Sequence, residues 1–381
     1  MNALALLFLL AFLVSVDLRI IAPVLPSISE SLRATAGAIG LAMTSYTFAY
    51  GAGQLAYGPL SDRHGRVAVI RLAALGFTVS TALSALCATT GQFVVVRLLT
   101  GAFAGAVIPL TIVHIGDTFE YAQRHAMVAR FSIVTSAGLA FSAAIGGLVA
   151  HFVSWRAMLI GYAVVALVPA ALLWRLPPGK PVRAPGEVAP VARFADFLMD
   201  PFGRLVYFSI FAEGFLLWGA VAYLGAYAAS RYGMSQLGVG LLFSLFGVGT
   251  MVGGALMGPL RGRLSERGLA GWGGLVMGLA LMAMIPPGPW PVFAAAMLLL
   301  GLGVVGLHTT LQVYATEISQ AARGKAFSLF PASLFSGMAV GTAVMGPLVD
   351  AGGQRIVLAI SGVGLAGVGV ITAAIRRRRT E

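Results

Sequence analysis

Four ionisable residues lie inside stretches of the sequence that are otherwise almost wholly apolar: Asp17, Arg97, Glu213 and His308. A charge at the centre of a bilayer costs about 2.5–3.5 kcal/mol on insertion scales, so each residue needs a structural partner or a chemical role. A carboxylate that gains and loses a proton inside a membrane can serve as a proton relay. The four residues are therefore candidates for proton coupling.

Asp17 and Arg97 are expected at overlapping depths in their helices. Asp17 lies about 14 residues, roughly 20 Å, from one end of its segment, and Arg97 lies roughly 8 Å from the opposite side. We expect an ion pair that separates when Asp17 is protonated; a permanent structural salt bridge is an equal alternative. Arg19 leaves the helix about 200° away from Asp17 and is expected to reach toward the outer surface.

Glu213 and His308 are expected at similar depths, roughly 12 Å from the inner ends of their helices. We interpret Glu213 as a second protonatable or cation-recognising carboxylate and His308 as its polar partner, although an intramembrane histidine more often only satisfies a hydrogen bond. Aromatic and amide side chains give a weaker indication of a substrate cavity, and lipid-facing positions are the alternative for them. These candidates are Tyr46, Tyr50, Gln54, Trp218, Tyr227 and Gln312.

The composition excludes a protein that folds in water. Of the 381 residues, 59% are hydrophobic and 10% are charged, whereas soluble chains carry roughly 25% charged residues. Apolar segments of spanning length fall at 3–28, 37–59, 68–90, 92–114, 126–150, 156–175, 205–228, 236–258, 269–287, 290–314, 326–349 and 355–375. The sequence therefore predicts an all-α polytopic membrane protein with twelve transmembrane helices, the first a retained helix rather than a signal peptide.

The basic residues predict the orientation in the membrane. Most of the 25 Lys and Arg follow the even-numbered helices or lie at the C-terminus; the others are Arg19, Arg33, Arg97, Arg156, Arg231 and Arg355. By the positive-inside rule both termini lie in the cytoplasm, as an even number of helices requires. We expect a multi-pass protein of a bacterial-type cytoplasmic membrane, and the net charge of +12 then needs no nucleic acid.

The two halves of the sequence share landmarks. Residues 58–60 (Gly-Pro-Leu) recur at 258–260, and Gly138 and Gly147 recur as Gly337 and Gly346. Matched topological positions favour duplication over chance repetition of glycine. We expect two pseudo-symmetric six-helix bundles, 1–175 and 204–381 with a basic tail, joined by a proline-rich cytoplasmic linker at 176–203. A short interfacial helix and a plain loop are both open within the linker.

The turn at residues 58–66 has the most specific composition in the chain. Glycines permit a tight reversal, and an acid between arginines can exchange ion-pair partners as helices move. The segment resembles the cytoplasmic loop motif G-x-L-x-D-R-x-G-R of the major facilitator superfamily, and the matching residues are Gly58, Leu60, Asp62, Arg63, Gly65 and Arg66. The alternative is an ordinary basic loop, which demands neither the glycines nor the acid.

Two further segments resemble the twelve-helix drug/proton antiporter branch of that superfamily. One holds Asp17, Pro23 and Pro26, and the other has the R-x-x-x-G pattern of Arg97 and Gly101. The resemblance spans the whole chain and implies a cytoplasmic gate in which Arg66 pairs with an acid ending helix four, here Asp117.

Helix five departs from the pattern of that branch. Ser142 and Ala143 stand where efflux antiporters of the family usually carry a Gly-Pro pair, which leaves the transport direction open. Small residues nevertheless allow close packing of helices four and five. The residues expected to do so are Gly101, Gly138, Gly146 and Gly147.

The expected function is proton-coupled secondary active transport, with export of a small amphipathic molecule by alternating access. A symporter, a sugar exporter or a lipid transporter of the same fold is the alternative, and a membrane enzyme or sensor is the alternative of another class. The sequence has no G-x-x-x-x-G-K-[ST], HExxH or GxSxG motif and one cysteine, Cys87, so we expect no enzyme, cofactor or metal site. The expected partners are the substrate, protons and the bilayer, without nucleic acid, and the protein is expected to be monomeric.

Overall fold

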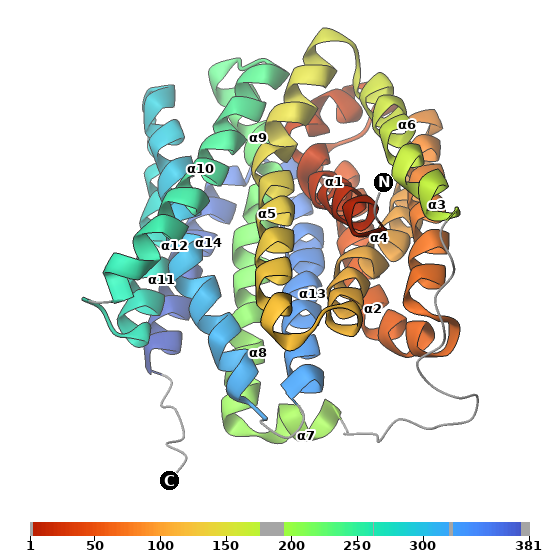
Figure 1. The fold of residues 1–381 in the computed structure, drawn as a ribbon. Coiled ribbons are helices and arrows are strands. Elements are labelled where there is room, and N and C mark those ends of the chain that lie inside the picture. The colour runs from red at the N-terminus through yellow and green to blue at the C-terminus, as the bar shows by residue number, and fades with distance from the viewer. Residues whose placement is uncertain (1–2, 176–193, 262, 320–322, 375–381) are drawn as a thin grey trace. The chain divides into compact units, whose positions relative to one another are not determined.

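The structure is a computed structural model that describes residues 3–175, 194–261, 263–319 and 323–374 (Figure 1). Every regular element within these ranges is helical. The predicted linker at 176–203 lies largely outside the described residues. Its last part contains a short helix, α7 (Phe194–Met199), as one of the two alternatives expects; the interfacial position of that helix stays a prediction.

The first half of the chain folds into six long helices. They are α1 (Ala3–Leu32), α2 (Ala36–His64), α3 (Arg66–Leu86), α4 (Thr90–Thr118), α5 (Tyr121–Phe152) and α6 (Trp155–Leu173). Hydroxyl side chains of Thr35, Thr89 and Ser154 accept backbone N–H groups at the starts of α2, α4 and α6, which satisfies donors that a helix start leaves unpaired. Gly65 separates α2 from α3 with φ 88°, a conformation that favours glycine.

The second half contains a helix that changes its winding. The segment predicted as one span at 205–228 consists of α8 (Pro201–Glu213), a π-helical turn η1 (Gly214–Trp218) and α9 (Gly219–Tyr232). The remaining helices are α10 (Gln236–Arg261), α11 (Glu266–Ala283), α12 (Trp290–Glu317), α13 (Arg323–Asp350) and α14 (Gln354–Ala374). A π-turn adds a residue to the helix and reorients the side chains on either side of it.

Helices cover all or most of each of the twelve predicted segments. In the described part of the chain, nine helices are long and apolar enough to cross a membrane, or ten if the bent pair Arg130–Leu139 and Ala144–Phe152 is one span. The helices α2 and α11 fall outside this set because α2 carries a polar and aromatic stripe and α11 begins with Glu266 and Arg267. The all-α polytopic fold is confirmed, and twelve crossings are consistent with it.

Contacts divide the chain into two compact units. One comprises Met1–Ala189 with Ala228–Leu241, and the other comprises Pro190–Tyr227 with Leu242–Glu381. The segment Ala228–Leu241, which joins α9 to α10, therefore groups with the first half of the chain. The predicted boundaries at 175 and 204 assign this segment to the second half instead. Those boundaries stay a prediction.

Glycines bring helices into close contact within the first unit. A Cβ atom on Gly138 of α5 would overlap the Phe12 carbonyl oxygen of α1, and one on Gly101 of α4 would overlap the Tyr46 carbonyl oxygen of α2. Gly146 lies against Ile20 of α1 in the same manner. Small residues thus allow the backbones to approach, as close packing of membrane helices requires.

The second unit repeats two of these contacts at corresponding positions. Gly337 of α13 lies against the Phe211 carbonyl oxygen of α8, and Gly301 of α12 lies against the Phe246 carbonyl oxygen of α10. Phe211 and Phe246 stand in their half where Phe12 and Tyr46 stand in the first. Each unit therefore uses the same pairs of helices for its closest packing, which supports the duplication inferred from the repeated glycines.

Candidate functional site

The first cluster joins α1 and α4 through two charged side chains. Arg97 donates from Nη1 to Asp17 Oδ1 and from Nη2 to Asp17 Oδ2, each at 3.1 Å. The side chains are 0% exposed at Asp17 and 3% exposed at Arg97. This bidentate, charge-assisted geometry is the strongest arrangement available to an arginine and a carboxylate. The structure therefore brings together the two residues that the sequence placed at overlapping depths.

Aromatic rings surround the arginine of this pair. The Arg97 guanidinium carbon lies 4.3 Å from the centroid of the Tyr46 ring, and Tyr46 stacks on Tyr50 with centroids 6.1 Å apart. A cation above an aromatic face is stabilised by the ring quadrupole, more so when water is absent. Of the predicted cavity residues, Tyr46 thus packs onto the ion pair and Tyr50 packs onto Tyr46, and both are buried.

The backbone beside Asp17 is held by α5 and α6. Ser142 of α5 donates its hydroxyl proton to the carbonyl oxygen of Val16, and Tyr162 of α6 donates to that of Leu13. Ser142 is the residue that marks the departure of helix five from the antiporter pattern. Its contact with α1 was missed by sequence reasoning, and a buried polar residue on a helix lined with small residues is the only signal that could have indicated it.

The second cluster joins α8 and α12. His308 Nδ1 lies 3.1 Å from Glu213 Oε1; the side chain of Glu213 is 0% exposed and that of His308 is 28% exposed. The other carboxylate oxygen of Glu213, Oε2, is buried without a hydrogen-bond partner in the described part of the chain. The His308 ring also meets the Phe330 ring of α13 edge-on at 5.3 Å. The predicted partners are adjacent, and they form a single contact rather than a bidentate one.

The π-turn η1 begins directly after Glu213. Because α13 approaches closely here, with Gly337 against Phe211 and Gly341 against Phe215, the backbone on both sides of the carboxylate is fixed. Turns of this kind occur often at functional sites. The sequence did not predict η1, because the spacing of apolar residues does not distinguish a single π-turn from the α-helix around it.

A third cluster lies at the turn between α2 and α3. Arg66 forms ion pairs with Asp62 at 2.5 Å and with Asp117, at the end of α4, at 3.2 Å. Its guanidinium also donates to the Ser61 hydroxyl, a contact that sequence reasoning did not include. The side chain of Asp117 is 45% exposed, so this network is partly solvated. Arg63 and Leu60 of the motif are exposed, and Gly58 has open space around it.

The other predicted cavity residues lie on different helices. Gln54 is partly buried on α2, and Trp218 ends η1 with its ring edge-on to Phe246 at 5.6 Å. Tyr227 is buried, donates its hydroxyl proton to the Met284 carbonyl oxygen at 3.2 Å and lines a narrow pocket of about 10 Å³. Gln312 is exposed on α12, one turn beyond His308. A common cavity for these residues stays a prediction, as does the expectation for Arg19, which is partly buried.

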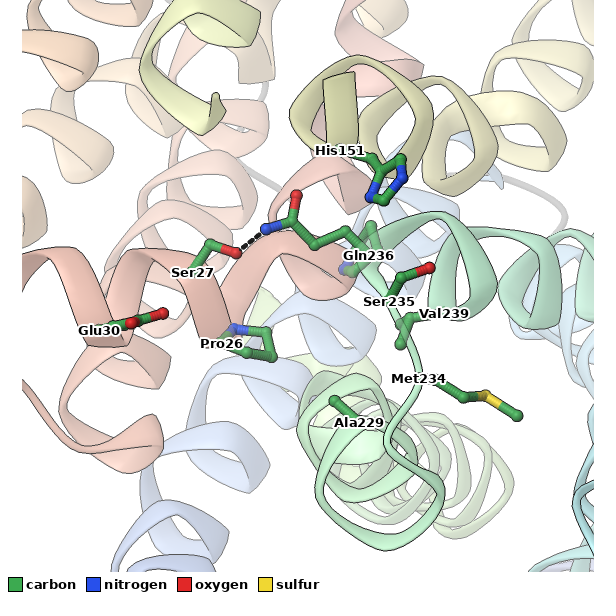
Figure 2. Close-up of a pocket in the computed structure, with 10 residues that line it drawn as sticks. Pro26, Ser27, Glu30, His151, Ala229, Met234, Ser235, Gln236 and Val239 are labelled. Carbon is green, nitrogen blue, oxygen red and sulfur yellow. Dashed lines mark hydrogen bonds between the residues drawn. The ribbon is translucent and has the colours of Figure 1, made fainter. Parts of the chain in front are cut away.

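A larger pocket of about 310 Å³ lies at the opposite end of α1 from its first residue (Figure 2). Its polar wall consists of Ser27, Glu30, His151, Ser235 and Gln236. Figure 2 shows Gln236, the first residue of α10, reaching across to Ser27 of α1, to which its side-chain amide donates a hydrogen bond. Sequence reasoning missed this pocket because it depends on residues 228–241 packing against α1 and α5.

Comparison with known proteins places this architecture in a family. The model of the Major Facilitator Superfamily matches residues 7–239 and 206–381. An MFS-type transporter of Bacillus subtilis, YceJ, is 25% identical over 91% of this chain and 89% of its own. A chloramphenicol resistance protein of Pseudomonas aeruginosa is 29% identical over 77% and 71%.

A solved structure shows the same fold. A mutant of the nucleoside transporter NupG superposes with a TM-score of 0.80 over 98% of both chains, at 15% identity. The repeated helix contacts, the G-x-L-x-D-R-x-G-R turn and the family match agree with one another, and the expectation of a transporter rather than an enzyme is confirmed. This chain is a multi-pass membrane transporter that belongs to the major facilitator superfamily.

Proposed function

We propose that this transporter uses the proton gradient to export a small amphipathic compound by alternating access. The observation that carries the proposal is the buried, bidentate pair of Asp17 and Arg97 between α1 and α4. A pair of this kind has two discrete states, because protonation of the carboxylate removes its negative charge and turns one of its two acceptor oxygens into a hydroxyl that guanidinium N–H groups no longer bind as well. The similarity to a chloramphenicol resistance protein supports an amphipathic cargo.

The chemistry of coupling follows from the geometry of the pair. While Asp17 is ionised, it holds the Arg97 fork and keeps α1 and α4 in one arrangement. When a proton arrives on Asp17, the ion pair is lost while Arg97 keeps its contact with the Tyr46 ring, and the cost of separating the two helices falls. Release of that proton on the other side of the membrane restores the pair and completes the cycle.

In the second unit, we assign a coupling or cation-recognising role to Glu213 with His308. The support is a buried carboxylate that has one oxygen engaged by His308 and one without a partner in the described residues. We assign the network of Arg66, Asp62 and Asp117 to a gate on the cytoplasmic side, where an arginine with two acidic partners can exchange them during closure. The substrate cavity is proposed to include Tyr46, Tyr50, Gln54, Trp218, Tyr227 and Gln312.

A symporter of the same fold is the second candidate. The observation in its favour is Ser142, which stands where efflux antiporters of the family usually have a Gly-Pro pair and which binds the α1 backbone instead. We further propose that the protein is a monomer in a cytoplasmic membrane with both termini in the cytoplasm, as the distribution of basic residues predicts.

The test is the variant Asp17→Asn in proteoliposomes with an imposed proton gradient. We expect loss of proton-driven substrate movement with substrate binding retained, because Asn keeps the shape of Asp but does not titrate. Glu30→Gln, on the same helix with an exposed side chain, is the matched control and should transport normally. Undiminished proton-driven transport by Asp17→Asn would show that the pair is only structural. The sign of the pH change inside the vesicles on substrate addition separates antiport from symport.

A further inference from the structure

Arg71 of α3 is a buried guanidinium that the transport mechanism does not use. The residue is 8% exposed, and its Nε and Nη2 atoms are buried without a hydrogen-bond partner in the described part of the chain. Buried donors in native proteins are nearly always satisfied, so an unsatisfied one indicates a missing water, ion or ligand. A charged group makes this argument stronger, because burial of an unpaired charge is costly.

The only described contact of the Arg71 charge is aromatic. Its guanidinium carbon lies 5.8 Å from the centroid of the Trp174 ring, at the end of α6, which packs beside α3. This contact stabilises the positive charge in part. It leaves the N–H groups in the guanidinium plane free for an acceptor, and Trp174 itself is half-exposed.

The depth of Arg71 matches the headgroup region of a bilayer. It lies five residues after Arg66, the first residue of α3, which is roughly 7.5 Å along the helix. In the proposed orientation this end of α3 is cytoplasmic, and tryptophan is enriched at such interfaces. Anionic lipids of the cytoplasmic leaflet attract basic residues at this depth, and basic pockets between helices bind their headgroups.

Exposed apolar side chains continue from this point along both helices. On α3 they are Leu72, Leu75 and Val79, and on α6 they are Val164, Val165, Leu167 and Val168. This surface offers contact to acyl chains directly beside the buried guanidinium. A free phosphate ion would satisfy the N–H donors but would leave the apolar surface uncovered.

We propose that Arg71 and Trp174 form a binding site for the phosphate group of an anionic phospholipid in the cytoplasmic leaflet. The planar fork of Arg71 donates to phosphate oxygens as arginine does in bidentate phosphate recognition, which requires neighbouring side chains to move aside because Nε and Nη2 are fully buried in the unliganded protein. The acyl chains lie along the exposed faces of α3 and α6. Only the choice of leaflet rests on the proposed orientation, and the site does not require proton coupling.

The first test measures lipid binding by the full-length protein in detergent, using native mass spectrometry with phosphatidylglycerol and phosphatidylcholine. We expect Arg71→Gln to weaken phosphatidylglycerol binding roughly fivefold, the factor that one basic residue contributes near an anionic surface. The affinity of Arg71→Lys for phosphatidylglycerol should lie between those of the unchanged protein and Arg71→Gln, because lysine keeps the positive charge but lacks the planar guanidinium. The control Arg175→Gln removes an exposed charge from the same end of the unit and should weaken phosphatidylglycerol binding less than Arg71→Gln does.

Two measurements on the unchanged sequence keep the proposal testable if Arg71→Gln does not fold. Phosphatidylglycerol with brominated acyl chains should quench the fluorescence of Trp174, as judged against Trp174→Phe, more strongly than brominated phosphatidylcholine does. Inorganic phosphate should fail to displace the lipid at millimolar concentration. Equal quenching by the two lipids, displacement by phosphate alone, or an Arg71→Gln variant that binds phosphatidylglycerol normally would each overturn the proposal.

Discussion

The two intramembrane clusters differ in how completely their charges are compensated. In the first unit, both oxygens of Asp17 are bound by Arg97, and neither side chain reaches solvent to any extent. In the second unit, Glu213 has one oxygen bound by a partly exposed His308 and one oxygen without a partner in the described residues. In the first cluster, both carboxylate oxygens are therefore paired. In the second cluster, one carboxylate oxygen is paired, and the histidine is partly exposed to solvent.

This difference is informative because the helix packing is repeated and the charges are not. At the spacing that relates Gly138 to Gly337, Asp17 corresponds to Leu216 and Glu213 to Val14. At the spacing that relates Gly101 to Gly301, Arg97 corresponds to Met297 and His308 to Ile108. The duplicated scaffold therefore carries a different ionisable pair in each half, which suits a division of labour between proton coupling and recognition of the cargo.

The largest effect is expected from Arg97→Gln. This variant leaves the Asp17 carboxylate buried without its cation, and breaking a buried pair in this way costs about 3–5 kcal/mol. We expect a marked fall in the thermal unfolding midpoint of the purified protein and loss of transport.

The control for this prediction is the double variant Asp17→Asn with Arg97→Gln. Removal of both charges eliminates the uncompensated carboxylate, so the double variant should recover most of the lost stability, and a double-mutant cycle gives the coupling. A double variant no more stable than Arg97→Gln alone would show that the two side chains do not depend on each other.

The fold was largely predictable from the sequence because a bilayer imposes strong constraints. A spanning helix needs a long apolar segment, and twelve such segments could be read directly. The pair of Asp17 and Arg97 was also accessible, since a charge among apolar residues needs a partner and helix rise gives its depth. The turn at Gly65 was indicated by glycine and by its acidic and basic neighbours, and the resemblance to the family motif implied the contact of Arg66 with Asp117.

The rest depends on tertiary contacts that carry no periodic signal. The π-turn after Glu213 differs from an α-helix by one residue, and local sequence does not express that difference. The pocket lined by Ser27, His151 and Gln236 requires residues 228–241 to pack with α1 and α5, which the even spacing of the predicted spans does not reveal. Arg71 was counted among the cytoplasmic positive charges, and only the structure shows that its guanidinium is buried.

A smaller effect on stability is expected from Glu213→Gln. The change removes a buried charge that has a single hydrogen-bond partner among the residues that the structure describes, so the free energy of unfolding should change by about 1 kcal/mol or less. Transport should instead lose part of its pH dependence or change its range of substrates, measured as initial rates at several pH values. Glu317→Gln, an exposed acid on α12, is the control and should alter neither property. Unchanged pH dependence together with an unchanged substrate range would remove Glu213 from the mechanism.

The smallest effect on stability is expected from Asp117→Asn, beside the turn between α2 and α3. Asp117 is 45% exposed, and exposed ion pairs contribute about 0–1 kcal/mol, so the unfolding midpoint should hardly move. Arg66 keeps its contact with Asp62, which is why Asp62→Asn should have the larger effect of the two on stability and on transport. A midpoint that falls as far for Asp117→Asn as for Arg97→Gln would contradict the distinction between solvated and buried pairs. If Asp117→Asn transports as the unchanged protein does, Asp62 is the partner through which Arg66 acts. In that variant Arg66 still has its ion pair with Asp62, which is the less exposed of the two acids.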